Sequence, residues 1–305
     1  MELIVNSIVP VFLLVALGYV FKRKKIITDE IDAFLNNLAY YLLLPSMIFI
    51  SIYKSPFDRI FSIKMIGGLY LAAFTVFLLA VLLARFFKHE KRGGFVLPSF
   101  RTNIAYIGFP IILNAYGQTA LGEIGVITGF IAPVLIMFSI LYLNLEYRSK
   151  GVRKSSVIYY IISDPLVISS IAGLTFTYFR IPLPKFLSNT VDMLSSMGSP
   201  LILIAVGSGL KISAITKDRA PIFTATVLKL AAQPLIAFLL FKFLIPLNTG
   251  MDFKVAVMTF TFPSALSTYI MVKQYRSDAE MTAAIIMTTT LLSIITMSAW
   301  ILILG

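Results

Sequence analysis

The residues best able to bind a ligand lie where a membrane span would normally carry none. Residues 95–117 are long and apolar enough to cross a bilayer, which takes about 20 residues. Their polar residues and helix breakers are Pro98, Arg101, Thr102, Asn103, Gly108 and Pro110. In hydrocarbon, backbone and side-chain polar groups must be satisfied within the protein. This composition therefore predicts a helix that is broken and lines a cavity.

A second apolar segment, residues 256–275, repeats the pattern in the other half of the chain. Its residues at mid-depth are Pro263, Ser264, Ser267 and Thr268. Two interrupted hydrophobic segments in corresponding halves indicate the binding site of a secondary transporter. We expect Asn103 to contact the substrate, because its amide can donate to a carboxylate. The alternative is that Asn103 only satisfies the backbone groups that the break sets free.

The neighbours of these breaks complete the predicted substrate site. Thr102 and Ile104 flank the asparagine, and Ile104 supplies apolar contact. After the second break, Ser264 and Ala265 expose N–H groups at the start of a half-helix, where the dipole favours an anion. Pro263 removes a backbone donor and breaks the helix.

One lysine lies inside a predicted span. Lys229 stands about ten residues, or ~15 Å, from the cytosolic edge. An ionisable residue at this depth is a candidate functional group. It is either a fixed internal cation or a titrating group for proton coupling. Gln233 follows one turn later and shares its face.

Two further charged residues lie near mid-depth. Asp164 precedes Pro165 and can pair with Lys229, carry protons or cap a broken helix. Arg101 can attract anions from a cytosolic vestibule, or its side chain can reach back to headgroups about 10 Å away. The sequence leaves these alternatives open.

Composition sets the class of protein. The chain has 305 residues, of which 58% are hydrophobic and 13% charged, whereas soluble domains have about 25% charged residues. We predict an all-α polytopic membrane protein with ten transmembrane helices. The apolar stretches are residues 3–21, 34–53, 62–87, 95–116, 120–146, 155–179, 188–210, 220–246, 252–274 and 280–303.

Charge predicts how the chain lies in the bilayer. The net charge is +12, and most Lys and Arg lie in the loops after the odd-numbered spans. Such loops stay in the cytoplasm, so we expect both termini outside. We expect an inner or plasma membrane location, with the lipid bilayer as a partner and no nucleic acid. The first apolar run follows Glu2 and not a basic segment, so we expect no cleaved signal peptide. With no Cys and one His, no metal cluster or cofactor is expected beyond H⁺ or Na⁺ coupling.

Proline spacing indicates an internal repeat. Pro10 and Pro45 are 35 residues apart, and so are Pro165 and Pro200. With five spans per repeat, the second copy is inverted in the membrane. The predicted repeats are residues 1–150 and 151–305, joined by a linker at residues 146–156.

Three segments resemble the auxin efflux carrier family, which includes bacterial permeases and plant auxin carriers. They are LNNLAYYLLLPSMIF (Leu35–Phe49), TNIAYIGFPIILNAYG (Thr102–Gly117) and FPSALSTYIMVKQY (Phe262–Tyr275). The resemblance implies two inverted five-helix repeats in which helices 4 and 9 are broken and cross. It also implies a scaffold of helices 1, 2, 6 and 7, a mobile transport domain of helices 3–5 and 8–10, and a possible homodimer.

This chain departs from the plant carriers in two ways. It has no long loop between its halves, and Thr102 stands where the plant pattern has a proline. The resemblance implies export or exchange of small organic anions by an elevator-type, alternating-access mechanism. Candidates range from malate-like dicarboxylates to auxin-like monocarboxylates.

Other classes of membrane protein fit the sequence less well than a carrier. An intramembrane aspartyl protease needs two facing carboxylates, and only Asp164 is clearly deep. The sequence has no glycine loop for binding phosphate. We therefore expect no enzyme. A non-transporting receptor or a channel on the same scaffold is the alternative.

Overall fold

The computed structural model describes residues 2–57, 61–147, 162–210, 219–247 and 250–305. Within these ranges the chain forms helices and turns, with a single isolated β-bridge. This confirms the all-α prediction. Most of the predicted linker at residues 146–156, including the repeat boundary after residue 150, lies outside the described residues.

The long helices confirm a multi-pass membrane protein. In the described part of the chain, seven helices are long and apolar enough to cross a bilayer. One of them, Ile104–Tyr147, has 44 residues and would be about 66 Å long if straight, twice the thickness of the hydrocarbon core. It kinks at Gly117, whose φ of 81° suits a residue without a Cβ. The count of ten spans stays a prediction.

Contacts divide the chain into two compact units. Unit 1 comprises Met1–Ile63, Ile104–Ala132 and Ile161–Leu210, and unit 2 comprises Lys64–Asn103, Pro133–Tyr160 and Lys211–Gly305. Each unit draws on both halves of the sequence. The two sequence repeats are a different division of the chain, and they stay a prediction.

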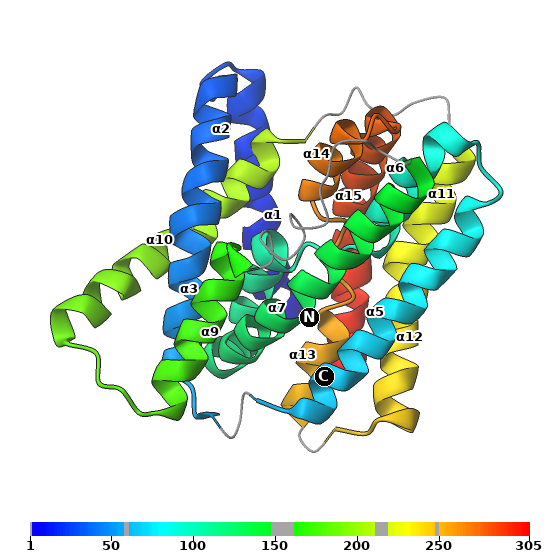
Figure 1. The fold of residues 1–305 in the computed structure, drawn as a ribbon. Coiled ribbons are helices and arrows are strands. Elements are labelled where there is room, and N and C mark those ends of the chain that lie inside the picture. The colour runs from blue at the N-terminus through cyan, green and yellow to red at the C-terminus, as the bar shows by residue number, and fades with distance from the viewer. Residues whose placement is uncertain (1, 58–60, 148–161, 211–218, 248–249) are drawn as a thin grey trace. The chain divides into compact units, whose positions relative to one another are not determined.

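Unit 1 is built on helices that lie side by side (Figure 1). Helix α10 packs along α1 and α3, and α3 also packs on α9. The elements are α1 (Glu2–Arg23), α2 (Asp29–Leu38), η1 (Ala39–Leu43), α3 (Leu44–Tyr53), η2 (Ile104–Gly108), the first part of α7 (Phe109–Tyr147), α9 (Pro165–Tyr178) and α10 (Lys185–Ser208).

Glycines permit the closest helix approach in unit 1. A Cβ at Gly207 of α10 would lie 1.9 Å from the carbonyl oxygen of Val15 in α1. A Cβ at Gly18 of α1 would lie 2.1 Å from the carbonyl oxygen of Ile204 in α10. Small residues let transmembrane backbones pack closely, and dispersion then replaces the hydrophobic drive that is absent in lipid.

Unit 2 is organised around its last helix. Helix α15 packs against α6, α11, α13 and α14. The elements are α5 (Ile63–Ala84), α6 (His89–Phe100), the second part of α7, α11 (Arg219–Val227), η4 (Leu228–Ala232), α12 (Gln233–Leu239), η5 (Leu240–Leu244), α13 (Gly250–Met258), α14 (Ser267–Gln274) and α15 (Ala279–Leu304).

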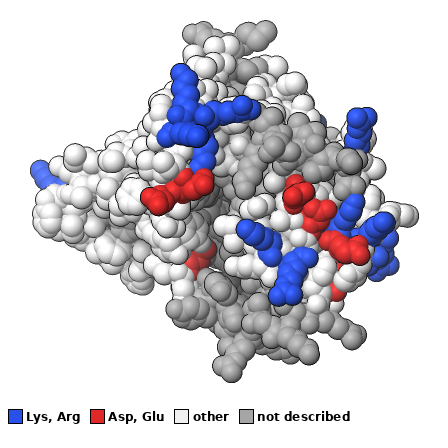
Figure 2. All heavy atoms as spheres, turned by 90° about the horizontal axis from the view of Figure 1, so that it is seen from above, with Lys and Arg blue, Asp and Glu red and all other residues white. Residues whose placement is uncertain are grey.

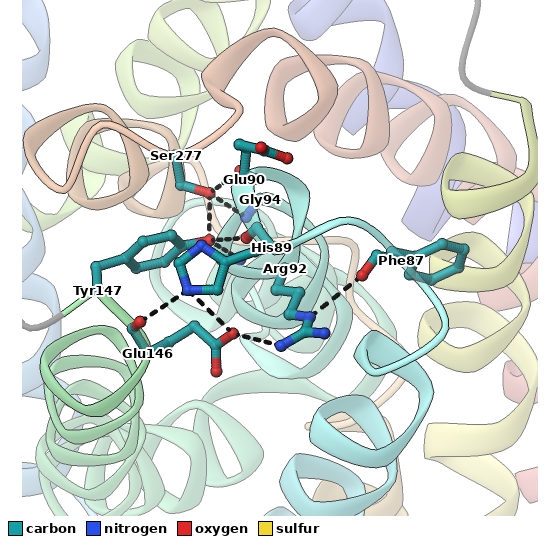
Figure 3. Close-up of polar contacts among 9 residues, drawn as sticks. Phe87, His89, Glu90, Arg92, Gly94, Glu146, Tyr147 and Ser277 are labelled. Atoms are coloured by element: carbon teal, nitrogen blue, oxygen red, sulfur yellow. Dashed lines mark hydrogen bonds and ion pairs between the residues drawn. The ribbon is translucent and has the colours of Figure 1, made fainter.

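A hydrogen-bonded cluster fixes the start of α6 within unit 2 (Figure 3). The Tyr147 hydroxyl donates to the carbonyl of His89 at 2.9 Å and accepts from the N–H of Gly93 at 2.8 Å. The Ser277 hydroxyl donates to the carbonyl of Glu90 at 2.7 Å. The end of α7 and the turn before α15 therefore hold the first turn of α6, which sets where α6 must end.

Exposed Lys and Arg side chains gather in clusters with acidic side chains beside them (Figure 2). In unit 1, Lys22 donates to Asp29 at 2.7 Å. In unit 2, Arg92 donates to Glu146 at 2.8 Å, and this hydrogen bond raises the pKa of Arg92. These pairs lie at helix ends, where charged side chains can stay in water.

We expect Gly207→Val to destabilise the protein, because its side chain would collide with backbone rather than with a side chain that could move. The loss should reach or exceed the about 1–3 kcal/mol typical of overpacking. Thermal unfolding of the detergent-solubilised chain measures it. Gly67→Val is the matched control, since a Cβ there meets nothing within 4 Å. Equal unfolding temperatures for the two variants would contradict the close approach.

Candidate functional site

The two interrupted segments of unit 2 pair with each other. Helix α6 ends at Phe100 and α13 ends at Met258, and neither continues directly as a helix. Thr102 and Ser264 form an antiparallel β-bridge. Its hydrogen bonds run from the Asn103 N–H to the Pro263 carbonyl at 2.9 Å and from the Ala265 N–H to the Arg101 carbonyl at 3.2 Å. The segments predicted to break do break, and they cross.

Side chains satisfy further backbone groups at this crossing. The Thr102 hydroxyl donates to the carbonyl of Thr259 at 2.9 Å, in the segment after α13. The Ser264 hydroxyl donates to the carbonyl of Pro98 at 2.6 Å, in α6. Each segment therefore supplies a hydroxyl to the other. This exchange meets the requirement that backbone polar groups in hydrocarbon find partners inside the protein.

The residues of the crossing are buried. Ser264 is 0% exposed, Asn103 is 4% exposed, and Thr102, Pro263 and Ala265 are buried as well. Of the six residues predicted to bind substrate, these five come together here. Ile104, the sixth, is the next residue in the chain but begins η2 and belongs to unit 1 by its contacts.

The backbone N–H groups predicted to meet an anion are already in use. Ala265 donates to the carbonyl of Arg101, and the Ser264 N–H lies 3.3 Å from the Thr289 hydroxyl oxygen. The described structure shows no backbone acceptor for the N–H groups of Leu266 and Ser267, at the start of α14. An anion at this half-helix would meet those two groups first.

Lys229 and Gln233 join the crossing through the end of α6. The Lys229 ammonium donates to the Gln233 side-chain oxygen at 2.6 Å, and the Gln233 amide donates to the carbonyl of Phe100 at 3.0 Å. Lys229 is 0% exposed. Phe100 is the last residue of α6, and a cation is favourable near the negative end of a helix dipole. Lys229 and Gln233 were predicted to share one helix face, and in the structure a direct hydrogen bond joins them.

Arg101 belongs to unit 2 and lies at the end of α6. Its side chain is buried, and its Nη1 lies 2.7 Å from the sulfur of Met271 in α14. The burial argues against the alternative in which this side chain reaches the headgroups. Arg101 and Lys229 are thus two cations inside the unit that contains the crossing.

Asp164 lies in unit 1 and caps α9. One carboxylate oxygen accepts from the N–H groups of Leu166 at 2.8 Å and Val167 at 3.3 Å, and the other accepts from the Tyr40 hydroxyl at 2.7 Å. This is the N-cap arrangement that satisfies the first N–H groups of a helix. Of the three roles left open for Asp164, the geometry provides the cap.

Turns of π-helix coincide with the candidate residues. Tyr40 lies in η1, Lys229 lies in η4, and η2 begins directly after Asn103. Such turns are rare and occur often at functional sites. They widen the helix and leave backbone groups for other partners. The sequence carries no clear pattern for them.

The sequence analysis predicted no binding role for three further polar residues. Thr289 in α15 binds Ser264, but its Thr-rich stretch is typical of helix packing. Tyr40 holds Asp164 from a position 124 residues away. Glu123 is a buried carboxylate in α7; an acidic residue in an apolar stretch was the signal that could have found it. The described residues contain no group of three or more His, Cys, Asp or Glu side chains placed to hold a metal.

Interrupted segments that pair at a buried, polar site are typical of membrane transporters. A family model described as "Membrane transport protein" matches residues 3–301. The chain belongs to this family, which confirms the resemblance to the auxin efflux carriers.

Proteins with transporter names are similar to this chain over nearly their whole length. An "Uncharacterized transporter" of Methanocaldococcus jannaschii is 28% identical over 304 residues, covering 97% of each chain. A "Putative malonate transporter" of Rhizobium meliloti is 26% identical, covering 97% of this chain and 94% of its own. "Uncharacterized transporter YfdV" of Escherichia coli K12 is 21% identical, with 97% and 96% coverage. Together with the family, they support a transporter.

We expect Thr289→Val to destabilise the protein, because Ser264 would lose the acceptor of its N–H and the donor to its hydroxyl in a buried place. Leaving such groups unsatisfied costs about 1–3 kcal/mol. Thermal unfolding in detergent measures the loss. Thr290→Val is the matched control, since the Thr290 hydroxyl bonds only within its own helix. If both variants unfold alike, Thr289 does not support the crossing.

Proposed function

We propose that this protein is a secondary carrier of small organic anions that binds a substrate carboxylate at the crossing of its interrupted segments. Asn103 donates its amide to the carboxylate, and apolar neighbours hold the rest of the substrate. The carrier works by alternating access of the elevator type, as the family resemblance implies. Enzymatic activity is not part of the proposal.

The main support for this proposal is the positive charge at the crossing. Two buried cations, Arg101 and Lys229, lie at the crossing, and among the described residues the Lys229 ammonium donates to the neutral side chain of Gln233. A buried charge is costly unless a partner compensates it. A substrate carboxylate would supply such a partner, whereas a cationic substrate would add to the positive charge.

Lys229 has a defined place in this scheme. Its ammonium contacts Gln233, and Gln233 contacts the final carbonyl of α6. The arrangement supports the fixed-cation alternative, in which Lys229 stabilises the end of the half-helix in the way that a bound Na⁺ would.

Two further observations support an organic anion. The relative from Rhizobium meliloti carries a name that refers to malonate, a dicarboxylate. The start of α14, with the N–H groups of Leu266 and Ser267, presents the positive end of a half-helix beside the crossing. Malonate is therefore the first substrate to test, followed by malate and indole-acetate.

We expect counterflow in proteoliposomes: internal unlabelled malonate should accelerate uptake of labelled malonate. Asn103→Ala should reduce this exchange at least tenfold, because the amide contacts the carboxylate. Asn189→Ala is the matched control, since Asn189 is exposed on α10 of unit 1. Radiolabel uptake at saturating and subsaturating malonate separates loss of binding from loss of turnover.

Two outcomes would overturn the carrier proposal. Saturable binding without any counterflow, for malonate, malate and indole-acetate alike, would favour a receptor. Flux that internal substrate does not accelerate would favour a channel. Full exchange in Asn103→Ala would remove this residue from the site while leaving a carrier.

We expect Asp164 to act as a cap rather than as the proton carrier. Asp164→Asn should keep the response of transport to a pH gradient, because asparagine is an equally good N-cap. Asp164→Ala should lower the free energy of unfolding by about 1 kcal/mol, since α9 loses its cap. Transport with and without a pH gradient, and thermal unfolding, measure these effects.

The opposite result for Asp164 is equally clear. If Asp164→Asn abolishes pH-driven transport but leaves exchange intact, then the carboxylate carries the coupled proton. Tyr40→Phe is the companion variant, because it removes one of the three donors to Asp164 and keeps the cap of α9. Parallel runs with a Na⁺ gradient test the other coupling ion.

A further inference from the structure

Unit 1 contains a cavity whose lining includes none of the residues of the crossing in unit 2. Its volume is about 540 Å³, within the range of about 300–1,000 Å³ that is typical of small-molecule sites. Helices α3, α7 and α10 form its walls, together with the turn after α3. Every residue that lines it belongs to unit 1.

One ion pair supplies the charge of this cavity. The Lys54 ammonium, at the end of α3, lies 2.6 and 2.7 Å from the two carboxylate oxygens of Asp192 in α10. The side chains are 53% and 38% exposed. An ion pair this exposed contributes little to stability, because water competes for both partners. A ligand carboxylate can therefore take the place of Asp192 on Lys54.

The neutral polar groups of the cavity divide into two kinds. Ser51, Ser55 and Ser196 donate their hydroxyl protons to carbonyls of their own helices or the adjoining turn. The described residues give no hydrogen-bond partner to the side chains of the other four, which are Gln118, Thr119, Ser195 and Ser199. Those four side chains have donors available to a ligand.

The break in α7 brings two of these donors into the cavity wall. Gly117 adopts a φ of 81°, and Gln118 and Thr119 follow it directly. They begin the part of α7 that follows the kink at Gly117, and the dipole at the start of a helix favours an anion. The cavity thus combines one ammonium, several uncommitted donors and a helix start.

We propose that this cavity is a second binding site for a small carboxylate, with Lys54 as its anchor and Asp192 as an internal carboxylate that occupies Lys54 when no ligand is bound. Gln118, Thr119, Ser195 and Ser199 donate to the ligand. With the orientation predicted from the loop charges, Lys54 lies at the non-cytosolic end of its helix. The site then collects anions on that side.

The two residues of the ion pair give opposite expectations. Lys54→Met removes the anchor, so malonate should bind at least tenfold more weakly. Asp192→Asn removes the competing carboxylate and leaves Lys54 free, so malonate should bind several-fold more tightly. If Lys54–Asp192 were only a structural ion pair, both variants would lose the same contact and malonate affinity would not move in opposite directions.

Isothermal titration of the purified full chain with sodium malonate, at low ionic strength and in the Asn103→Ala background, isolates this site. Sodium chloride and sodium phosphate serve as comparison salts. Lys185→Met is the matched control, because Lys185 is an exposed lysine at the start of α10, outside the cavity lining. We expect Lys185→Met to bind malonate like its Asn103→Ala parent.

A variant that keeps the ion pair guards against a folding defect in Lys54→Met. Ser199→Met fills the cavity and leaves Lys54 and Asp192 in place, so it should also weaken malonate binding. Equal malonate affinity in the Lys54→Met and Lys185→Met variants would overturn the proposal. So would phosphate binding as tight as malonate, because the site would then not select carboxylates.

This test is distinct from that of the proposed function. If wild-type protein shows no malonate counterflow but the Lys54-dependent site is present, the carrier proposal fails and this one stands. If counterflow depends on Asn103 but titration finds no Lys54-dependent site, the cavity proposal fails alone.

Discussion

The structure of unit 2 depends on one constraint: backbone N–H and C=O groups that leave a helix inside hydrocarbon must find partners there. The chain meets it by pairing one interruption with the other. Asn103 and Ala265 donate backbone hydrogen bonds to Pro263 and Arg101. Neither interrupted segment could be stable at this depth alone, since each provides the acceptors that the other needs.

The elements around the crossing follow from this pairing. Helix α15 provides the Thr289 hydroxyl as a partner for Ser264, and the Gln233 side-chain amide donates to the last carbonyl of α6. The cluster around Tyr147 holds the other end of α6 in place. A binding site made of broken helices needs such support, because unpaired polar groups would otherwise favour a different packing. Asn103 and the start of α14 are the parts of the crossing at which we propose that the ligand binds.

Unit 1 meets the same constraint at the start of α9. Asp164 caps the start of α9, and Tyr40 in a π-helix turn holds the carboxylate. Gly18 and Gly207 bring α1 and α10 into backbone contact. Its cavity is the exception to this close packing, and uncommitted polar side chains such as Gln118 and Ser199 line it. That contrast is why the cavity stands out as a place for a ligand.

Much of the candidate site could be predicted, because its signals lie within short stretches of the sequence. Prolines and polar residues within an apolar stretch disrupt a helix wherever the stretch is placed, so the breaks at residues 101–103 and 263–265 could be read directly. Lys229 and Gln233 stand four residues apart, a spacing that puts two side chains on one helix face. Ser264 and Ala265 were predicted to offer their N–H groups to an anion, but the structure gives both N–H groups partners from other parts of the chain.

The sequence by itself determined that the chain is a helical membrane protein, where two of its segments are interrupted, and which family it resembles. These follow from composition and from patterns within about 20 residues, the length of one span. Only the tertiary structure decided which groups meet: Thr289 with Ser264, Tyr40 with Asp164, and Lys54 with Asp192. The physical reason is that a hydrogen bond or ion pair depends on the distance between two side chains in space. Partners 25, 124 and 138 residues apart leave no periodic trace in the sequence.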